Sequence, residues 1–347
     1  MNLIYGIKDK PKFGQIVLFA IQQLLAIMAA TIAVPAVVGN GMTASAALFG
    51  AGVGSIVYLL FTKSSSPVFL GSSFAFIGSM FSAFGGAASM AIGYAGLILG
   101  AAIAGLVYVV IALIVKFCGV KWINKLMPPV IIGPTVAIIG LSLAGNAIGD
   151  LTSSSVEGGS VYVCLICGLV TLAVTMLCST YGKKMVKLVP FIIGILAGYA
   201  CASIFALIGK LTNNPALVVI NYSALTSMSS VVALPAFSFL KADWSGVTGS
   251  YFVTIFVAYA PVAFVVFAEH LADHKNLSTI VGVDLLEEPG LTRTLLGDGI
   301  GSFVGAFFGG CPNTTYGESI GCVAITRNAS SVSIWGAAIA CIIFSLI

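Results

Sequence analysis

Apolar runs long enough to cross a lipid bilayer follow one another through almost the whole chain. Of its 347 residues, 59% are hydrophobic and only 7% are charged, whereas soluble domains average about 25% charged residues. A globule of this size could not cover its surface in water with so few charges. A spanning helix needs roughly 20 mainly apolar residues. The sequence therefore predicts a membrane protein with many spans and almost no soluble body.

We expect eleven membrane segments. They cover residues 13–38, 44–61, 67–80, 92–117, 126–148, 161–177, 188–207, 251–271, 294–309, 311–326 and 331–347. The apolar stretch after the charged start is too long for the core of a signal peptide, so we interpret it as the first span. A long connection follows residue 208, and a charged loop with His274 and Lys275 follows residue 271. Because the chain is still apolar at Ile347, we expect further spans in the full protein.

The distribution of basic residues gives an orientation. With the N-terminus in the cytoplasm and every segment counted as a crossing, all 15 basic residues except Lys210 and Lys241 fall on the cytoplasmic side. Cytoplasmic loops of membrane proteins carry such an excess of Lys and Arg. The pattern requires both short segments, 67–80 and 311–326, to cross. It predicts a multi-pass protein of the cytoplasmic (inner) membrane with a cytoplasmic N-terminus.

Several other classes of function lack support in the sequence. The eight cysteines lie mostly inside apolar runs, where they are typical of small buried side chains. Cys164 and Cys167 have redox-motif spacing but lie in the middle of a predicted helix, without a βαβ context. The basic residues are too scattered for a nucleic-acid site. We therefore expect no nucleic acid, no metal and no cofactor.

Two acids near the end of the eighth segment are candidates for proton transfer. Glu269 and Asp273 are four residues apart and share one helix face. Two carboxylates on one face at low dielectric do not both ionise easily, so such a pair is suited to carry a proton. The alternative is an acidic cluster at the membrane boundary that faces water. We assign His270 and His274 to the cytoplasmic rim.

Glu318 lies in the segment Cys311–Gly321, whose Pro, Asn, Thr, Tyr and Gly residues do not favour a straight helix. The segment that begins at Pro67 has a similar extended half followed by a short apolar half. Short, interrupted segments in corresponding places of two halves indicate the binding site of a transporter. The alternative is a pair of structural re-entrant loops. For Asp298, between two glycines of the ninth segment, we expect a buried structural or coupling role.

At these residues the sequence resembles the nucleobase–ascorbate transporter family, which contains uracil and xanthine permeases. The resemblance covers the whole chain, and its most specific part is the last of four motifs. The motifs are Gln22-Gln23, Gly71-Ser72-Ser73-Phe74-Ala75-Phe76, Ala268-Glu269-His270, and Pro312-Asn313-Thr314-Thr315-Tyr316-Gly317-Glu318 running on to Thr326-Arg327.

The resemblance implies an all-α fold of fourteen spans in two inverted repeats of seven, with short strands in spans 3 and 10. It implies a core domain from residues 1–125 (spans 1–4) and 249–347 (spans 8–11). Residues 126–210 (spans 5–7) would form part of a gate domain, and residues 211–248 an extracytoplasmic connection. Gate spans 12–14 would be missing from this sequence. The resemblance leaves a homodimer open.

The resemblance also implies roles for single residues. The side chains of Glu269 and Glu318 would hold the base, and the backbone at Phe74 and Gly317 would bind a ring oxygen. Tyr316 and Ala30 would be wall contacts. The physical chemistry agrees, because carboxylates suit the N–H edges of a nucleobase and free backbone N–H groups suit its carbonyls. Asp273 and Asp298, together with Glu269, are assigned to proton coupling or structure.

These features predict a symporter that imports uracil with protons by alternating access. Three departures from the family pattern keep xanthine or another purine open: Ser319 replaces the usual Asn, Gln23 replaces a frequent His, and Asp273 stands where some uracil permeases have His. An anion transporter of the same fold is a second alternative, although two acids beside the site would repel an anion. An enzyme or a channel has no supporting motif.

Overall fold

The computed structural model describes residues 3–120, 122–123, 129–142, 144–183, 185–222 and 232–347. It divides into two compact units, one from residues 1–139 and 232–347 and the other from residues 140–231. Three of the basic residues used for the orientation, Lys121, Lys125 and Lys184, lie outside the described residues, and so does the predicted domain boundary at residues 125 and 126.

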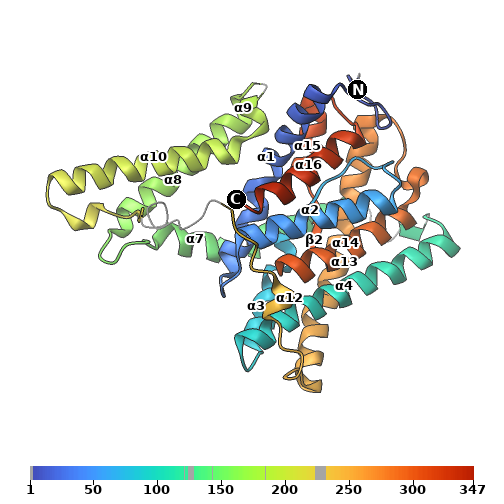
Figure 1. The fold of residues 1–347 in the computed structure, drawn as a ribbon, viewed down its shortest axis with the longest axis horizontal. Helices are drawn as coiled ribbons and strands as arrows, with labels where there is room; N and C mark the ends of the chain where they lie inside the picture. Colours follow the sequence, from blue (N-terminus) through green and yellow to red (C-terminus); the bar gives the residue numbers. More distant parts are fainter. Residues whose placement is uncertain (1–2, 121, 124–128, 143, 184, 223–231) are drawn as a thin grey trace. The chain divides into compact units, whose positions relative to one another are not determined.

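The first unit is built almost entirely of helices (Figure 1). Its main helices are α1 (Phe13–Val38), α2 (Ala44–Phe61), α3 (Ile77–Gly85), α4 (Met90–Cys118), α13 (Gly249–Val281), α14 (Leu291–Gly309), α15 (Gly317–Thr326) and α16 (Ser331–Phe344). Shorter elements are η1 (Phe74–Phe76), α12 (Ser238–Lys241) and η3 (Leu286–Gly290), and α6 (Pro129–Ser142) runs across the division between the units. The first two predicted segments coincide with α1 and α2.

Helix α13 is longer than the sequence suggested. The predicted span ended at residue 271, but α13 continues to Val281 and has 33 residues. The Thr248 hydroxyl caps its start by accepting from the Tyr251 amide at 3.2 Å. Gly282 ends it in the left-handed conformation at φ 75°, which a glycine adopts at little cost. The predicted loop at His274 and Lys275 is therefore wrong, because both residues are helical.

Glycines allow α2 and α14 to pack backbone against backbone. A Cβ atom on Gly54 would lie 2.7 Å from the Gly301 carbonyl oxygen, and one on Gly50 would lie 2.5 Å from that of Gly305. Small residues permit this close approach in membrane helices. The Asn313 side chain fills the remaining space and donates through Nδ2 to the Gly50 carbonyl at 3.0 Å.

A two-stranded antiparallel ladder lies inside the first unit. Strand β1 (Leu70–Ser72) pairs with β2 (Asn313–Thr315), with Leu70 opposite Thr315 and Ser72 opposite Asn313. Strand β1 leads into η1 and α3, and β2 leads into α15. Because the strands are antiparallel, the two short helices start from opposite ends of the ladder. The order of two helices, strand with half-helix, and helix thus occurs twice, at α1–α4 and at α13–α16.

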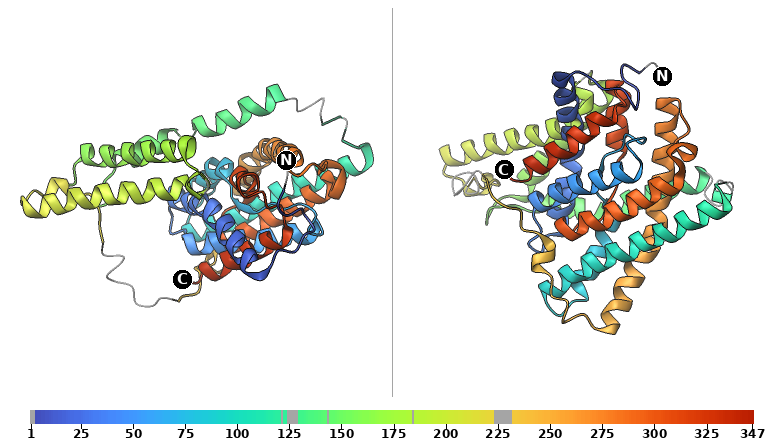
Figure 2. Two further views of the ribbon diagram at one scale, coloured as in Figure 1. Left: turned by 90° about the horizontal axis from the view of Figure 1, so that it is seen from above. Right: turned by 45° about the vertical axis from the view of Figure 1, so that its right-hand side comes forward.

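The second unit contains α7 (Ala144–Thr152), α8 (Val161–Tyr181), α9 (Met185–Leu188), α10 (Pro190–Leu211) and η2 (Pro215–Leu217). Helices α8 and α10 pack side by side, as both views of Figure 2 show. Cβ atoms on Gly194 and Gly198 would lie 1.9 and 2.0 Å from the hydroxyls of Thr175 and Thr171. The sequence predicted one segment at 126–148. In the described part of the chain, this region instead contains two helices, α6 and α7.

Six of the described helices are long and apolar enough to cross a membrane: α1, α2, α4, α8, α10 and α13. The two strand-containing segments are each broken into a strand and a short helix, as predicted. Their irregular backbone is compatible with a bilayer because it is buried in protein: all residues of both strands are buried.

The connection before α13 is attached to α4 by a lysine. Lys241 Nζ donates to the Gly41 carbonyl at 2.8 Å and lies 4.9 Å from the ring centroid of Tyr94. Partial burial lowers the pKa of Lys241. Two residues on, the side-chain and backbone groups of Ser245 donate to Asp243 and lower the pKa of that carboxyl.

Candidate functional site

The predicted acid pair on α13 is attached to strand β2. Glu269 and Asp273 are both partly exposed, and Thr315 donates to Asp273 Oδ2 at 2.6 Å. Thr315 is the last residue of β2, three positions before Glu318. Helix α13 also packs against α15, which carries Glu318 in its first turn. The structure thus brings the elements that carry all three acids together.

The start of α15 is open on one side. Gly317 is exposed, and a Cβ atom on it would meet nothing within 4 Å. Tyr316 is buried, and its hydroxyl donates to the Ser72 carbonyl on the opposite strand. In the part of the chain that the structure describes, the side chain of the N-cap residue Tyr316 makes no hydrogen bond to the amides of the first turn. Backbone N–H groups at such a helix start are available for an acceptor.

The two remaining predicted contacts lie on neighbouring elements. Phe74 begins η1 after strand β1, Ala30 lies in the second half of α1, and both are partly exposed. Helix α13 packs against η1, and α1 packs against α15 and β1. All predicted site residues therefore belong to the first unit and to elements that are in contact, while their roles stay predictions.

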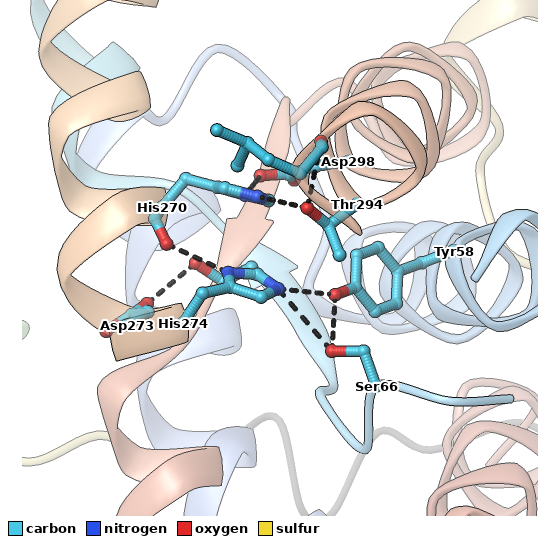
Figure 3. Close-up of polar contacts among 9 residues, drawn as sticks. Tyr58, Ser66, His270, Asp273, His274, Thr294 and Asp298 are labelled. Carbon is cyan, nitrogen blue, oxygen red and sulfur yellow. Dashed lines mark hydrogen bonds and ion pairs between the residues drawn. The ribbon is translucent and has the colours of Figure 1, made fainter. Parts of the chain in front are cut away.

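The assignment of His270 and His274 to a water-facing rim is wrong. Both side chains are 0% exposed. Their rings stack with centroids 4.0 Å apart, one helical turn from each other (Figure 3). Burial of two imidazoles requires polar partners, and these come from α14, from α2 and the loop after it, and from the backbone of α13 itself.

His270 is hydrogen-bonded to two residues of α14. Its Nε2 lies 3.0 Å from the Thr294 hydroxyl, which is also 3.1 Å from the Leu291 carbonyl oxygen. Its Nδ1 lies 2.7 Å from Asp298 Oδ2. Both ring nitrogens therefore have a buried polar partner. Asp298 is 1% exposed, so the predicted burial is confirmed.

His274 is held by a second set of partners. Its Nδ1 lies 2.8 Å from the His270 carbonyl oxygen and therefore carries a proton that it donates. Its Nε2 lies 2.7 Å from the Tyr58 hydroxyl on α2 and 3.4 Å from the Ser66 hydroxyl. Tyr58 and Ser66 are themselves hydrogen-bonded at 2.8 Å. Figure 3 shows these groups around the buried face of α13.

Acids and histidines thus alternate on α13 with different surroundings. Each acid, Glu269 or Asp273, is followed directly by a fully buried histidine. Because successive helical residues are about 100° apart, the histidine bonds to α14 and α2 fix the rotation of α13. With that rotation Glu269 and Asp273 are partly exposed. The four-residue spacing of the histidines was visible in the sequence, but their partners were not.

Two of the departures from the family pattern meet in the structure. Gln23 on α1 donates through Nε2 to the Ser319 hydroxyl, and the Phe69 amide donates to the same oxygen at 3.1 Å. Both Gln23 and Ser319 are buried. The pair therefore joins α1, α15 and the backbone before β1. Within the described part of the chain, no cluster of three or more His, Cys, Asp or Glu side chains is arranged to hold a metal.

The chain is similar to known permeases over almost its whole length. The model of the permease family matches residues 14–347. The chain is 38% identical to the uracil permease of Bacillus caldolyticus over 349 aligned residues, which cover 99% of this chain and 74% of that protein. It is 35% identical to the uracil permease of Escherichia coli K12 over 343 residues, which cover 99% and 73%.

Solved structures share the fold at low sequence identity. The transmembrane domain of the cyanobacterial bicarbonate transporter BicA superposes with a TM-score of 0.70 at 16% identity, covering 98% of this chain and 85% of that domain. The transporter SLC26A9 gives a TM-score of 0.62 at 13% identity, covering 97% and 55%. These likenesses establish a helical membrane transporter fold.

Proposed function

Because this chain belongs to the permease family that contains the nucleobase–ascorbate transporters, and is a uracil permease-like membrane transporter rather than an enzyme, we propose that it imports uracil together with protons. The observation that carries the proposal is the Thr315–Asp273 bond of 2.6 Å. It joins the helix that bears Glu269 to the strand that leads into Gly317 and Glu318. This contact supports a single site made of these carboxyl groups and the backbone amides at the start of α15.

This set of groups matches the edges of a nucleobase. Uracil is planar and neutral, with two N–H donors and two carbonyl acceptors. In the proposed complex the carboxyl groups of Glu269 and Glu318 accept from its N–H groups, and the backbone amides at Phe74 and Gly317 donate to its carbonyls. Tyr316 and Ala30 form the walls. A polar pocket that pairs every donor and acceptor rejects analogues that leave one unpaired.

Proton coupling is assigned to the acids of α13 and α14. In the proposal a proton on Glu269 favours substrate binding, with Asp273 and Asp298 as coupling or structural partners. Proton and base then shift each other's affinity by the same factor, because binding linkage is reciprocal. No cofactor is invoked; the proton is the coupling ion.

The proposal includes the inverted-repeat architecture. The helix order that recurs at α1–α4 and α13–α16 supports two repeats, which we extend to seven spans each. In the proposal the first unit contains the core domain, and the second contains part of the gate domain. We place the protein in the cell membrane with a cytoplasmic N-terminus, from the distribution of basic residues. The proposal includes a homodimer.

The second candidate is a purine permease. The observation that favours it is Asp273, which stands where some uracil permeases have His and where purine members have Asp. The anion alternative receives less support. Similarity to the bicarbonate transporter concerns the fold alone, and three acids on the elements around this site would repel an anion.

Equilibrium binding to the purified chain in lipid nanodiscs tests the substrate. We expect labelled uracil to bind and to be displaced by excess uracil, but not by xanthine or bicarbonate. Glu318→Gln should weaken uracil binding at least tenfold, because it replaces one acceptor-only side chain with a mixed amide. Glu287→Gln, on the exposed segment after α13, is the matched control and should bind normally. Unchanged affinity in Glu318→Gln would remove Glu318 from the site.

Proton coupling requires a separate measurement. In weakly buffered solution with a pH indicator, uracil binding should take up protons, and its affinity should fall as the pH rises. In cells, uptake of labelled uracil should collapse when a protonophore is added. Binding without proton uptake, at an affinity independent of pH, would contradict the coupling and leave the substrate assignment intact.

A further inference from the structure

A small cavity lies beside the His270–Asp298 pair, within the first unit. The volume that the centre of a water-sized sphere can occupy in it is about 10 Å³. Tyr108 of α4, Asp298 of α14 and Asn313 of β2 are among the residues that line it. A cavity of roughly 10–15 Å³ is needed to hold one water molecule, so the room suffices for one and no more.

Each of these three residues carries a buried polar atom without a bonding partner. Within the described part of the chain, the Tyr108 hydroxyl, Asp298 Oδ1 and Asn313 Oδ1 make no hydrogen bond. The side chains are at most 4% exposed. Leaving such a group unpaired costs about 1–3 kcal/mol, so three around one cavity indicate a bound molecule that pairs them.

The orientation of the asparagine amide is fixed by its other contact. Asn313 Nδ2 donates to the Gly50 carbonyl at 3.0 Å, and a carbonyl can only accept. The free Asn313 atom is therefore an acceptor. Asp298 Oδ1 is a carboxyl oxygen whose neighbour Oδ2 is bonded to His270, so it is also an acceptor. The Tyr108 hydroxyl is the one donor among the three.

We propose that this cavity binds a single water molecule, which donates to Asp298 Oδ1 and Asn313 Oδ1 and accepts from the Tyr108 hydroxyl. Two donated bonds and one accepted bond use both protons of the water and one lone pair. Buried waters typically make about three hydrogen bonds to groups that would otherwise be unpaired. Donors, acceptors and volume therefore all fit the same ligand.

A sodium ion fits this place less well than water. A water can accept a hydrogen bond from the Tyr108 hydroxyl, whereas a cation cannot accept one. A cation would therefore leave this buried donor unpaired, which is costly. The bound water instead joins α4, α14 and β2. Since β2 leads directly into Tyr316 and Gly317, it holds the strand that presents the open helix start.

Two tyrosines allow a matched test. Tyr108 and Tyr259 are both buried with hydroxyls that lack a partner in the described residues, but only Tyr108 lines the cavity. We expect Tyr108→Phe to lower the thermal unfolding midpoint by roughly 2–4 °C, the shift that loss of one bond produces. Tyr259→Phe should leave the midpoint unchanged or raise it. Equal effects of the two substitutions would overturn the proposal.

A structure of the 347-residue chain at a resolution that shows waters gives the direct test. We expect one density peak within hydrogen-bond distance of the three atoms in the wild type. A dry cavity would refute the proposal, even if Tyr108→Phe does not fold. Unfolding in sodium chloride and in choline chloride of equal ionic strength should give the same midpoint. A rise that requires sodium and disappears in Tyr108→Phe would assign the site to a cation instead.

Discussion

Tyr58→Phe is the sharpest test of how α13 is held in place. The substitution removes only the hydroxyl, which lies 2.7 Å from His274 Nε2 and 2.8 Å from the Ser66 hydroxyl. The phenyl ring fills the same buried space, so no cavity is expected. The remaining neighbour of Nε2 is Ser66 at 3.4 Å, beyond the 2.7–3.2 Å range of good hydrogen bonds.

The magnitude follows from the burial of the imidazole. His274 is 0% exposed, so water cannot replace the lost partner. A buried polar atom that loses its partner costs about 1–3 kcal/mol. We therefore expect Tyr58→Phe to lower the free energy of unfolding by about 2 kcal/mol. Titration of the purified protein with SDS in mixed micelles, followed by tryptophan fluorescence, measures this difference.

A double variant separates this bond from general damage. Replacing both partners of a buried hydrogen bond by apolar groups can be nearly neutral, whereas removing one is not. Tyr58→Phe combined with His274→Leu should therefore be destabilised by less than the sum of the two single variants. If the effects simply add, or if Tyr58→Phe unfolds like the wild type, the reasoning about His274 is refuted.

Two further substitutions test the site and the packing around it. Thr315→Val removes the donor to Asp273, so we expect uracil affinity to fall by up to about tenfold, because a hydrogen bond contributes about 0.5–1.5 kcal/mol and about 1.4 kcal/mol is a factor of ten. Equilibrium binding measures the change. Gly305→Ala would place a Cβ atom 2.3 Å from Asn313 Nδ2, so we expect a loss of about 1–3 kcal/mol in the SDS titration. Gly321→Ala, where a Cβ would meet nothing within 4 Å, should be neutral.

Much of the fold could be predicted because its signals are local. Helices α1 and α2 have polar or charged residues at their starts, Lys12 and Thr43, and no charged residue lies between their boundaries. The strand-containing segments were visible through their Pro, Gly and Ser content. The end of α13 was missed because hydropathy falls after residue 271. The helix continues there because His274 makes buried polar contacts, and it ends at Gly282, which adopts the left-handed conformation.

The sequence predicted the acids of the candidate site but not the buried histidines beside them. Spacing placed Glu269 and Asp273 on one helix face, and the motif around Glu318 indicated a broken segment. His270 and His274 were misplaced because a histidine beside an acid resembles a polar boundary. Their actual partners lie 28 and 216 residues away, at Asp298 and Tyr58. No spacing rule reveals a contact over such separations; it emerges only when α2, α13 and α14 pack.

The alternation of acids and histidines constrains how the transporter can move. Turning α13 so that Glu269 and Asp273 face elsewhere would pull His270 and His274 away from fully buried partners on α14 and α2. Each broken bond would leave an unpaired polar group at about 1–3 kcal/mol. A substrate can shift an equilibrium only by its difference in affinity for the two states. We therefore expect α2, α13 and α14 to move as one body during transport, with the change of access occurring outside this group of helices.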